Sequence, residues 1–93
     1  MTAAADAGIS ALEVRQSVSE IVRRVLDSDG VDPAVDLFDQ GATSLAFIRI
    51  VGQVNDKYNI TVDVLKLEEA SIDCLSAVVS AQISGENQLT HRG

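Results

Sequence analysis

Apolar residues recur at helical spacing in three stretches of the chain. In the first stretch, steps of three and four residues join Val14, Val18, Ile21, Val22 and Val25. Charged and amide side chains occupy the opposite face of this stretch. Ser10 followed by Glu13 matches the capping box, in which each side chain binds the backbone N–H of the other residue. The pattern therefore predicts a helix over residues 10–26.

The second stretch carries two apolar strips, where a helix packed on one side needs one. Its core stripe, within about 100° of the helix circumference, comprises Phe47, Ile50, Val51, Val54 and Tyr58. A second strip of Leu45, Ile48 and Gly52 lies about 100–160° from the start of that stripe. Either this second strip packs on the preceding loop, or it is a docking surface for a partner. We predict a helix over 45–58, with Ser44 as its N-cap.

The third stretch predicts a last helix over 72–84, with Ser71 as its cap and Gly85 as its end. Between the second and third stretches, Asp63 is suited to cap a short helical turn over 64–67. These elements give an all-α fold of four helices. We expect a flexible lead-in over 1–9, a domain over 10–84 and a flexible tail over 85–93.

The loop over 27–43 has a length that usually serves a function. Gly30 is expected to take the left-handed conformation after the first helix. Val35, Leu37 and Phe38 are expected to tuck under the helices and pin the loop. The aspartates between 27 and 32 do not make a calcium loop, because Asp32 and Phe38 occupy the positions that need glycine and glutamate. No metal is therefore expected.

Composition narrows the class of protein. The chain has 93 residues, which is one domain, and with 3% aromatic residues its core must be aliphatic. The net charge of −7 argues against binding to nucleic acid or to an anionic membrane. With no apolar run near 18 residues and no signal peptide, we expect a cytoplasmic protein. The single Cys74 is expected in the core.

Ser44 stands out as a candidate for chemistry, but not as a catalytic nucleophile. A serine nucleophile needs an adjacent base, and the one histidine is His91 in the predicted tail. The residues around Ser44 also lack the Gly-x-Ser-x-Gly elbow of hydrolases. We therefore predict that the chain is not an enzyme.

The stretch from Leu37 to Leu45 resembles the attachment site of acyl and peptidyl carrier proteins. In that family the serine receives a 4'-phosphopantetheine arm derived from coenzyme A. The resemblance extends over about 12–83. It implies a four-helix, acyl-carrier-like bundle with a long loop between helices 1 and 2 and a short third helix. It also implies that Ser44 holds the arm, whose thiol carries a cargo as a thioester.

Thr43 and Arg49 point to one branch of this family. Fatty-acid carriers usually have an aspartate before the serine and an acidic second helix, whereas this chain has Thr43 and Arg49. Gly41-x-x-Ser44-Leu45 followed by Arg49 is similar to the peptidyl carrier, or thiolation, branch of nonribosomal peptide and antibiotic biosynthesis. The chain is expected to be a free-standing monomer.

The resemblance also implies partners and a surface that meets them. The implied partners are a phosphopantetheinyl transferase, an adenylating or loading enzyme, and tailoring or condensation enzymes. The expected contact surface comprises Thr43, Leu45, Ile48, Arg49 and Gly52. Two other functions stay open: an acyl carrier of polyketide or fatty acid synthesis, and a small helical adaptor that binds a partner through Leu45 and Ile48 without a cofactor.

Overall fold

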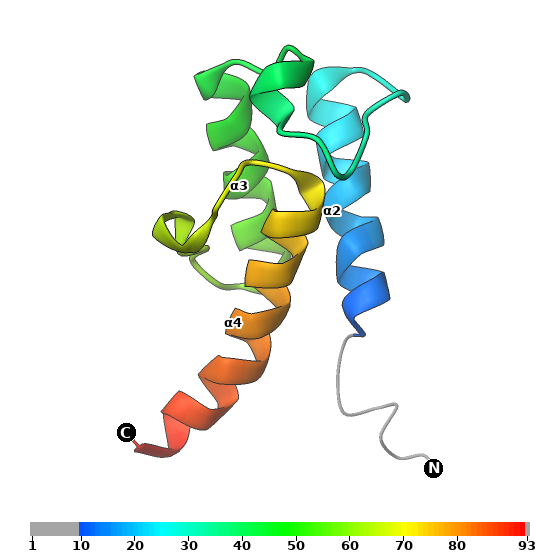
Figure 1. Cartoon of the computed structure of the whole chain (residues 1–93). Helices are drawn as coiled ribbons and strands as arrows, with labels where there is room; N and C mark the ends of the chain where they lie inside the picture. Colours follow the sequence, from blue (N-terminus) through cyan, green and yellow to red (C-terminus); the bar gives the residue numbers. More distant parts are fainter. Residues whose placement is uncertain (1–9, 93) are drawn as a thin grey trace.

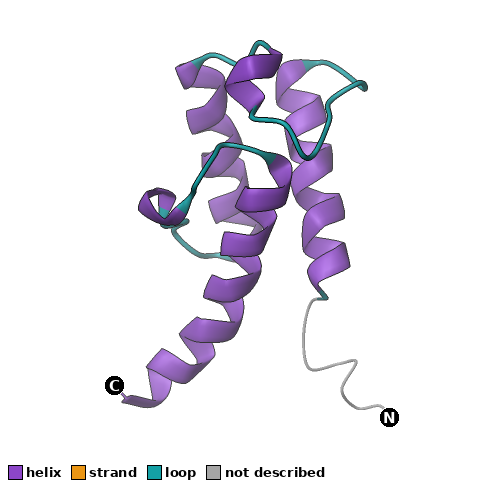
Figure 2. Cartoon of the chain, viewed as in Figure 1, coloured by secondary structure: helices purple, strands orange, loops and turns teal. Residues whose placement is uncertain are grey.

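The computed structural model describes residues 10–92, with side chains described over 10–84. In this part of the chain the structure has three α-helices, two short 3-10 helices and no strand (Figures 1 and 2). The elements in order are α2 (Ala11–Leu26), η1 (Leu37–Gln40), α3 (Ser44–Tyr58), η2 (Val64–Lys66) and α4 (Ile72–Arg92). Figure 1 shows α2 running opposite to α3 and α4, with the loop between α2 and α3 crossing one end. The predicted all-α class is confirmed.

Two predicted elements differ from those in the structure. The short third helix is a single 3-10 turn, η2, which is one residue shorter than predicted. The last helix continues through Gly85 to Arg92, so its predicted end at Ser84 is wrong. A glycine costs a helix interior only about 1 kcal/mol, and no proline follows this one, so the helix is free to continue. The lead-in over 1–9 lies outside the described residues.

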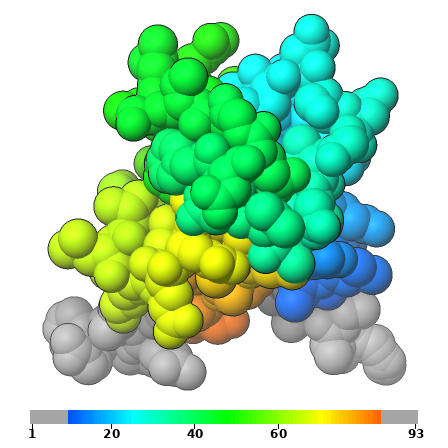
Figure 3. Space-filling model, turned by 45° about the horizontal axis from the view of Figure 1, so that its top comes forward, coloured from blue at the N-terminus to red at the C-terminus, as the bar shows by residue number. Residues whose placement is uncertain are grey.

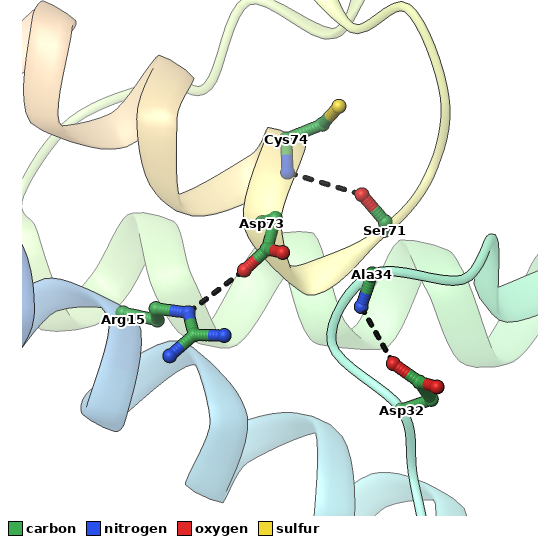
Figure 4. A network of polar contacts seen from close by, with 6 residues as sticks. All are labelled: Arg15, Asp32, Ala34, Ser71, Asp73 and Cys74. Atoms are coloured by element: carbon green, nitrogen blue, oxygen red, sulfur yellow. Dashed lines mark hydrogen bonds and ion pairs between the residues drawn. The ribbon is translucent and has the colours of Figure 1, made fainter.

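The starts of the helices follow the predicted capping residues. The N–H of Glu13 donates to Ser10 Oγ at 3.1 Å, and the N–H of Ser10 donates to Glu13 Oε1 at 3.2 Å. The N–H of Cys74 donates to Ser71 Oγ at 3.1 Å at the start of α4 (Figure 4). Asp63 caps η2 by accepting from the N–H of Leu65. The capping predictions for Ser10, Ser71 and Asp63 are confirmed.

α2 ends at Leu26, as predicted, but the residue that takes the left-handed conformation after it differs. Asp27, and not Gly30, takes the left-handed conformation, with φ of 55°. Aspartate is among the few residues other than glycine that adopt this region readily, because its short polar side chain bonds locally. The left-handed residue therefore follows the helix directly, three residues before Gly30.

An aliphatic core lies between α2, α3 and α4. The core residues with at most 1% exposure comprise Val14, Val18, Val22, Leu37, Ile50, Val54, Ile72, Leu75 and Val79. On α3, Ile50 and Val54 of the predicted stripe are fully buried, while Phe47, Val51 and Tyr58 are partly buried against the core. Cys74 is half-buried and free. Each fully buried aliphatic side chain contributes about 1.5–3 kcal/mol to folding.

The loop over 27–43 is tied to the start of α4. The N–H of Leu37 donates to the carbonyl of Ala70 at 2.8 Å, and the N–H of Ala70 donates to Asp36 Oδ2 at 3.1 Å. The N–H of Asp73 donates to the carbonyl of Pro33 at 3.0 Å. These bonds fix the position of the loop relative to α4.

Only one of the three residues predicted to pin the loop is buried. Leu37 is fully buried, whereas Val35 is 37% exposed and Phe38 is 44% exposed. The prediction is therefore wrong for Val35, while Phe38 packs on Phe47 of α3 without being buried. Hydrogen bonds that join Asp36 and Leu37 to Ala70 hold the loop.

A surface ion pair joins α2 to α4. Arg15 Nε donates to Asp73 Oδ1 at 2.7 Å, and Figure 4 shows the two side chains pointing at each other. Both side chains are close to half exposed, so the pair contributes at most about 1 kcal/mol. No helix in the described part of the chain is long and apolar enough to cross a membrane.

Candidate functional site

The junction between the loop and α3 begins at Gly41. This residue ends η1 with φ of 101°, and its N–H donates to the carbonyl oxygens of Leu37 and Phe38. A Cβ at this position would meet nothing within 4 Å, so the backbone conformation, and not the available space, requires glycine. Ala42 follows as a buried residue whose N–H donates to the carbonyl of Leu37 at 3.0 Å. The chain therefore enters α3 along a defined path.

Thr43, and not Ser44, is the N-cap of α3. The N–H of Ala46 donates to Thr43 Oγ1 at 3.1 Å, and the N–H of Phe47 donates to the carbonyl of Thr43 at 3.0 Å. Thr43 has the extended backbone of an N-cap, with φ of −88° and ψ of 167°, whereas Ser44 already lies in the helix. The predicted cap at Ser44 is wrong by one residue.

Ser44 is an exposed first residue of α3. Because Thr43 supplies the cap, no hydrogen bond among the described residues engages the Ser44 hydroxyl. The first N–H groups of a helix lack partners within the helix, and they favour negative charge by about 0.3–1 kcal/mol. A phosphate ester on Ser44 Oγ would fit this environment. The Ser44 hydroxyl is therefore available for the attachment of a phosphate group. No described side chain that could act as a base binds this hydroxyl.

The second strip on α3 is exposed. Leu45 is 65% exposed and Ile48 is 64% exposed, so the alternative that they pack on the loop is wrong. Arg49 and Gly52 are also exposed. A Cβ on Gly52 would meet nothing within 4 Å, which means that no described part of the chain requires glycine there. Figure 3 shows the loop and the start of α3 side by side on one face of the molecule.

A family model described as "Phosphopantetheine attachment site" matches residues 13–79. The chain belongs to this family. No curated protein and no solved structure matches the chain significantly. A domain of this family is a site for covalent attachment of 4'-phosphopantetheine, and it places the chain in the carrier protein superfamily. Such carrier domains are generally non-catalytic, and they interact with a phosphopantetheinyl transferase and with catalytic partners.

The predicted site residues of this carrier domain lie together over the first turns of α3. Thr43 and Ser44 are at its start, followed by Leu45, Ile48, Arg49 and Gly52. Relative to Ser44, Ile48 lies about 40° around the helix, while Leu45 lies about 100° and Arg49 about 140° around it. The residues therefore form one broad exposed face.

Phe38 is a surface residue of the carrier domain that the sequence did not identify. Its ring centroid lies 5.5 Å from that of Phe47, with the two rings tilted at 50°. This contact places an exposed aromatic side chain of η1 against the first turn of α3. In the sequence, the pair Leu37–Phe38 gives no sign of which member is buried.

Other polar clusters of the carrier domain lie away from Ser44. An open groove between α2 and α3 is lined by residues near the other end of α3, among them Gln53, Asp56 and Lys57. Among the described residues, no group of three histidine, cysteine, aspartate or glutamate side chains is placed to hold a metal ion.

Proposed function

We propose that Ser44 receives the 4'-phosphopantetheine arm of this carrier domain and that the chain is a peptidyl carrier protein. The observation that supports Ser44 most directly is its free, exposed hydroxyl at the first position of α3, next to a residue that supplies the cap. The match over residues 13–79 includes this junction.

Arm addition needs a transferase and coenzyme A. Ser44 Oγ forms a bond to the phosphorus that bears the pantetheine, and the bond from that phosphorus to the leaving adenosine 3',5'-bisphosphate breaks. The serine proton passes to a base of the transferase, because no described side chain of this chain stands ready to take it. The attached arm supplies a thiol, which holds the cargo as a thioester. The chain itself presents Ser44 and binds the partner enzymes.

The peptidyl branch is favoured by the residues around Ser44. The Thr43 hydroxyl caps α3. The only charged residue on the first three turns of α3 is the exposed cation Arg49. Together with Leu45, Ile48 and Gly52, these residues make a surface that is largely apolar. We propose that it meets the transferase and the adenylating, tailoring or condensation enzymes, and that η2 takes the place of the short third helix of the carrier bundle.

Intact-mass spectrometry tests the attachment site. Wild-type protein incubated with coenzyme A and a phosphopantetheinyl transferase should gain the mass of one phosphopantetheine, and Ser44→Ala should gain none. Ser28→Ala is the matched control, because Ser28 is an exposed serine on the same loop and should not affect the reaction. Arm addition to Ser44→Ala would refute the proposal.

A further inference from the structure

Gln40 makes the densest set of side-chain hydrogen bonds in the loop before Ser44. Its Oε1 accepts from the N–H of Asp32 at 2.8 Å, and its Nε2 donates to the carbonyl oxygens of Asp32 and Val35, both at 2.9 Å. Both amide protons and one acceptor site are thus in use. The opposite assignment of the amide oxygen and nitrogen would break all three bonds.

These partners select glutamine at this position. One N–H and two carbonyl oxygens face the side chain. A primary amide suits these partners, because its oxygen can accept from the N–H and its NH₂ group can donate to both carbonyl oxygens. A carboxylate would bring negative charge against two carbonyl oxygens, and an aliphatic side chain would leave the carbonyl of Val35 without this donor.

The bonds of the Gln40 side chain join two consecutive parts of the loop, each of which is also held to the segment at the start of α4. The turn over 32–35 is closed locally. The N–H of Val35 donates to the carbonyl of Asp32. The N–H of Ala34 donates to Asp32 Oδ1, as Figure 4 shows. The other part, η1, is held to Ala70 through Asp36 and Leu37. Gln40 is the last residue of η1, and its side chain reaches back to the turn.

The two parts that Gln40 joins carry the exposed apolar residues of the loop. Val35 belongs to the turn and Phe38 belongs to η1. Phe38 packs on Phe47 in the first turn of α3, so this surface adjoins the start of that helix. A transferase that reaches Ser44 must approach the same end of the molecule, which is formed by the loop and the start of α3 (Figure 3).

We infer that Gln40 is a positioning residue for arm addition: it holds Val35 and Phe38 in one rigid surface that the phosphopantetheinyl transferase contacts when it modifies Ser44. The inference rests on the proposed attachment at Ser44. A rigid surface binds more tightly than one that must be ordered on contact, because ordering each side chain costs binding free energy. Gln40 therefore affects binding of the transferase and not the chemical step.

The test compares Gln40→Glu and Gln40→Leu with wild type in arm addition. The KM for the apo protein should rise by about three- to tenfold, which corresponds to ordering one or two side chains, while kcat stays within twofold. Gln16→Glu is the matched control, since Gln16 is exposed on α2 and the change is chemically the same. Its KM should equal that of wild type.

Amide hydrogen exchange supplies a second readout. In both Gln40 variants the Asp32 N–H should exchange faster than in wild type, while amides of α2 and α3 keep their protection. An unchanged KM in both variants would overturn the role of Gln40, as would an equal rise in Gln16→Glu. Loss of the helical signal in both variants would overturn it as well, because Gln40 would then hold the whole fold. Failure of Ser44→Ala to block arm addition would instead refute the proposed function.

Discussion

Thr43 caps α3 in place of Ser44, which was expected both to cap the helix and to carry the arm. Thr43 uses its hydroxyl to bind the N–H of Ala46, and this leaves the Ser44 hydroxyl exposed. A hydroxyl that caps a helix and also carries an arm would lose part of its capping geometry on modification. With the cap one residue earlier, a modified Ser44 leaves the start of α3 intact.

This position of the cap predicts unequal effects of two neighbouring substitutions on stability. Thr43→Ala should lower the free energy of unfolding by about 0.5–2 kcal/mol, because it removes the cap. Ser44→Ala should change it by at most about 0.5 kcal/mol, because it removes an exposed hydroxyl that binds nothing in the described chain. Urea denaturation of the two apo variants measures both values. A larger loss in Ser44→Ala would show that Ser44 is the cap.

The errors at Ser44 and Gly30 both concern residues that suit a capping position as well as their neighbours do. Serine and threonine both cap helices, and the backbone dihedrals that decide between Thr43 and Ser44 are not visible in the sequence. Asp27 and Gly30 both tolerate the left-handed conformation, and the one that lies where the helix ends adopts it. Sequence predicts the type of cap here, but not its position to within a residue or two.

At the scale of the elements, α3 behaves as its periodicity predicts. The buried and partly buried residues lie on one face, and Leu45 and Ile48 lie outside it. Helical periodicity depends only on the geometry of the helix itself, which is why the sequence could assign both faces. The loop has no such periodicity. The hydrogen bonds that join Asp36 and Leu37 to Ala70 link residues far apart in sequence, so the sequence pattern could not predict these bonds.

The exposed strip on α3 predicts a variant that separates binding from stability. Ile48→Asp should leave the free energy of unfolding within about 0.5 kcal/mol of wild type, because the side chain is 64% exposed. It should raise the KM for arm addition or cargo loading, because a charge replaces apolar contact area with the partner. Ile50→Ala, at a fully buried position, should instead cost about 2–5 kcal/mol.

Leu12→Asp is the control for this variant. Leu12 is 60% exposed on α2, so the same chemical change is made at a similar exposure on another helix. Its KM should match that of wild type. The docking role of the strip fails if Ile48→Asp destabilises the protein as much as Ile50→Ala does, or if Leu12→Asp raises the KM equally. Ile50 and not Phe47 is chosen as the buried position for comparison, because Phe47 is only half-buried.

At the scale of the whole molecule, the negative charge at this end lies on the loop beside α3, and not on the first turns of α3 itself. The chain has a net charge of −7, and the loop over 27–43 carries five of its aspartates, Asp27, Asp29, Asp32, Asp36 and Asp39. The first three turns of α3 carry no acidic residue and one cation, Arg49. Composition alone describes an acidic protein, whereas the fold presents a largely apolar surface with one positive charge beside Ser44.

This surface predicts which loading enzymes accept the modified protein. On the first turns of α3, an enzyme with a basic surface, suited to the acidic second helix of fatty-acid carriers, would meet Arg49 and the apolar strip instead of carboxylates. Like charges disfavour its contact with Arg49. The holo protein should therefore accept an aminoacyl group from an adenylating enzyme of its own pathway and accept malonyl poorly from an acyl transferase. Intact mass after each reaction measures loading, with Ser44→Ala as the control for non-specific acylation. Efficient malonyl loading together with no aminoacyl loading would place the protein in the acyl branch of the family.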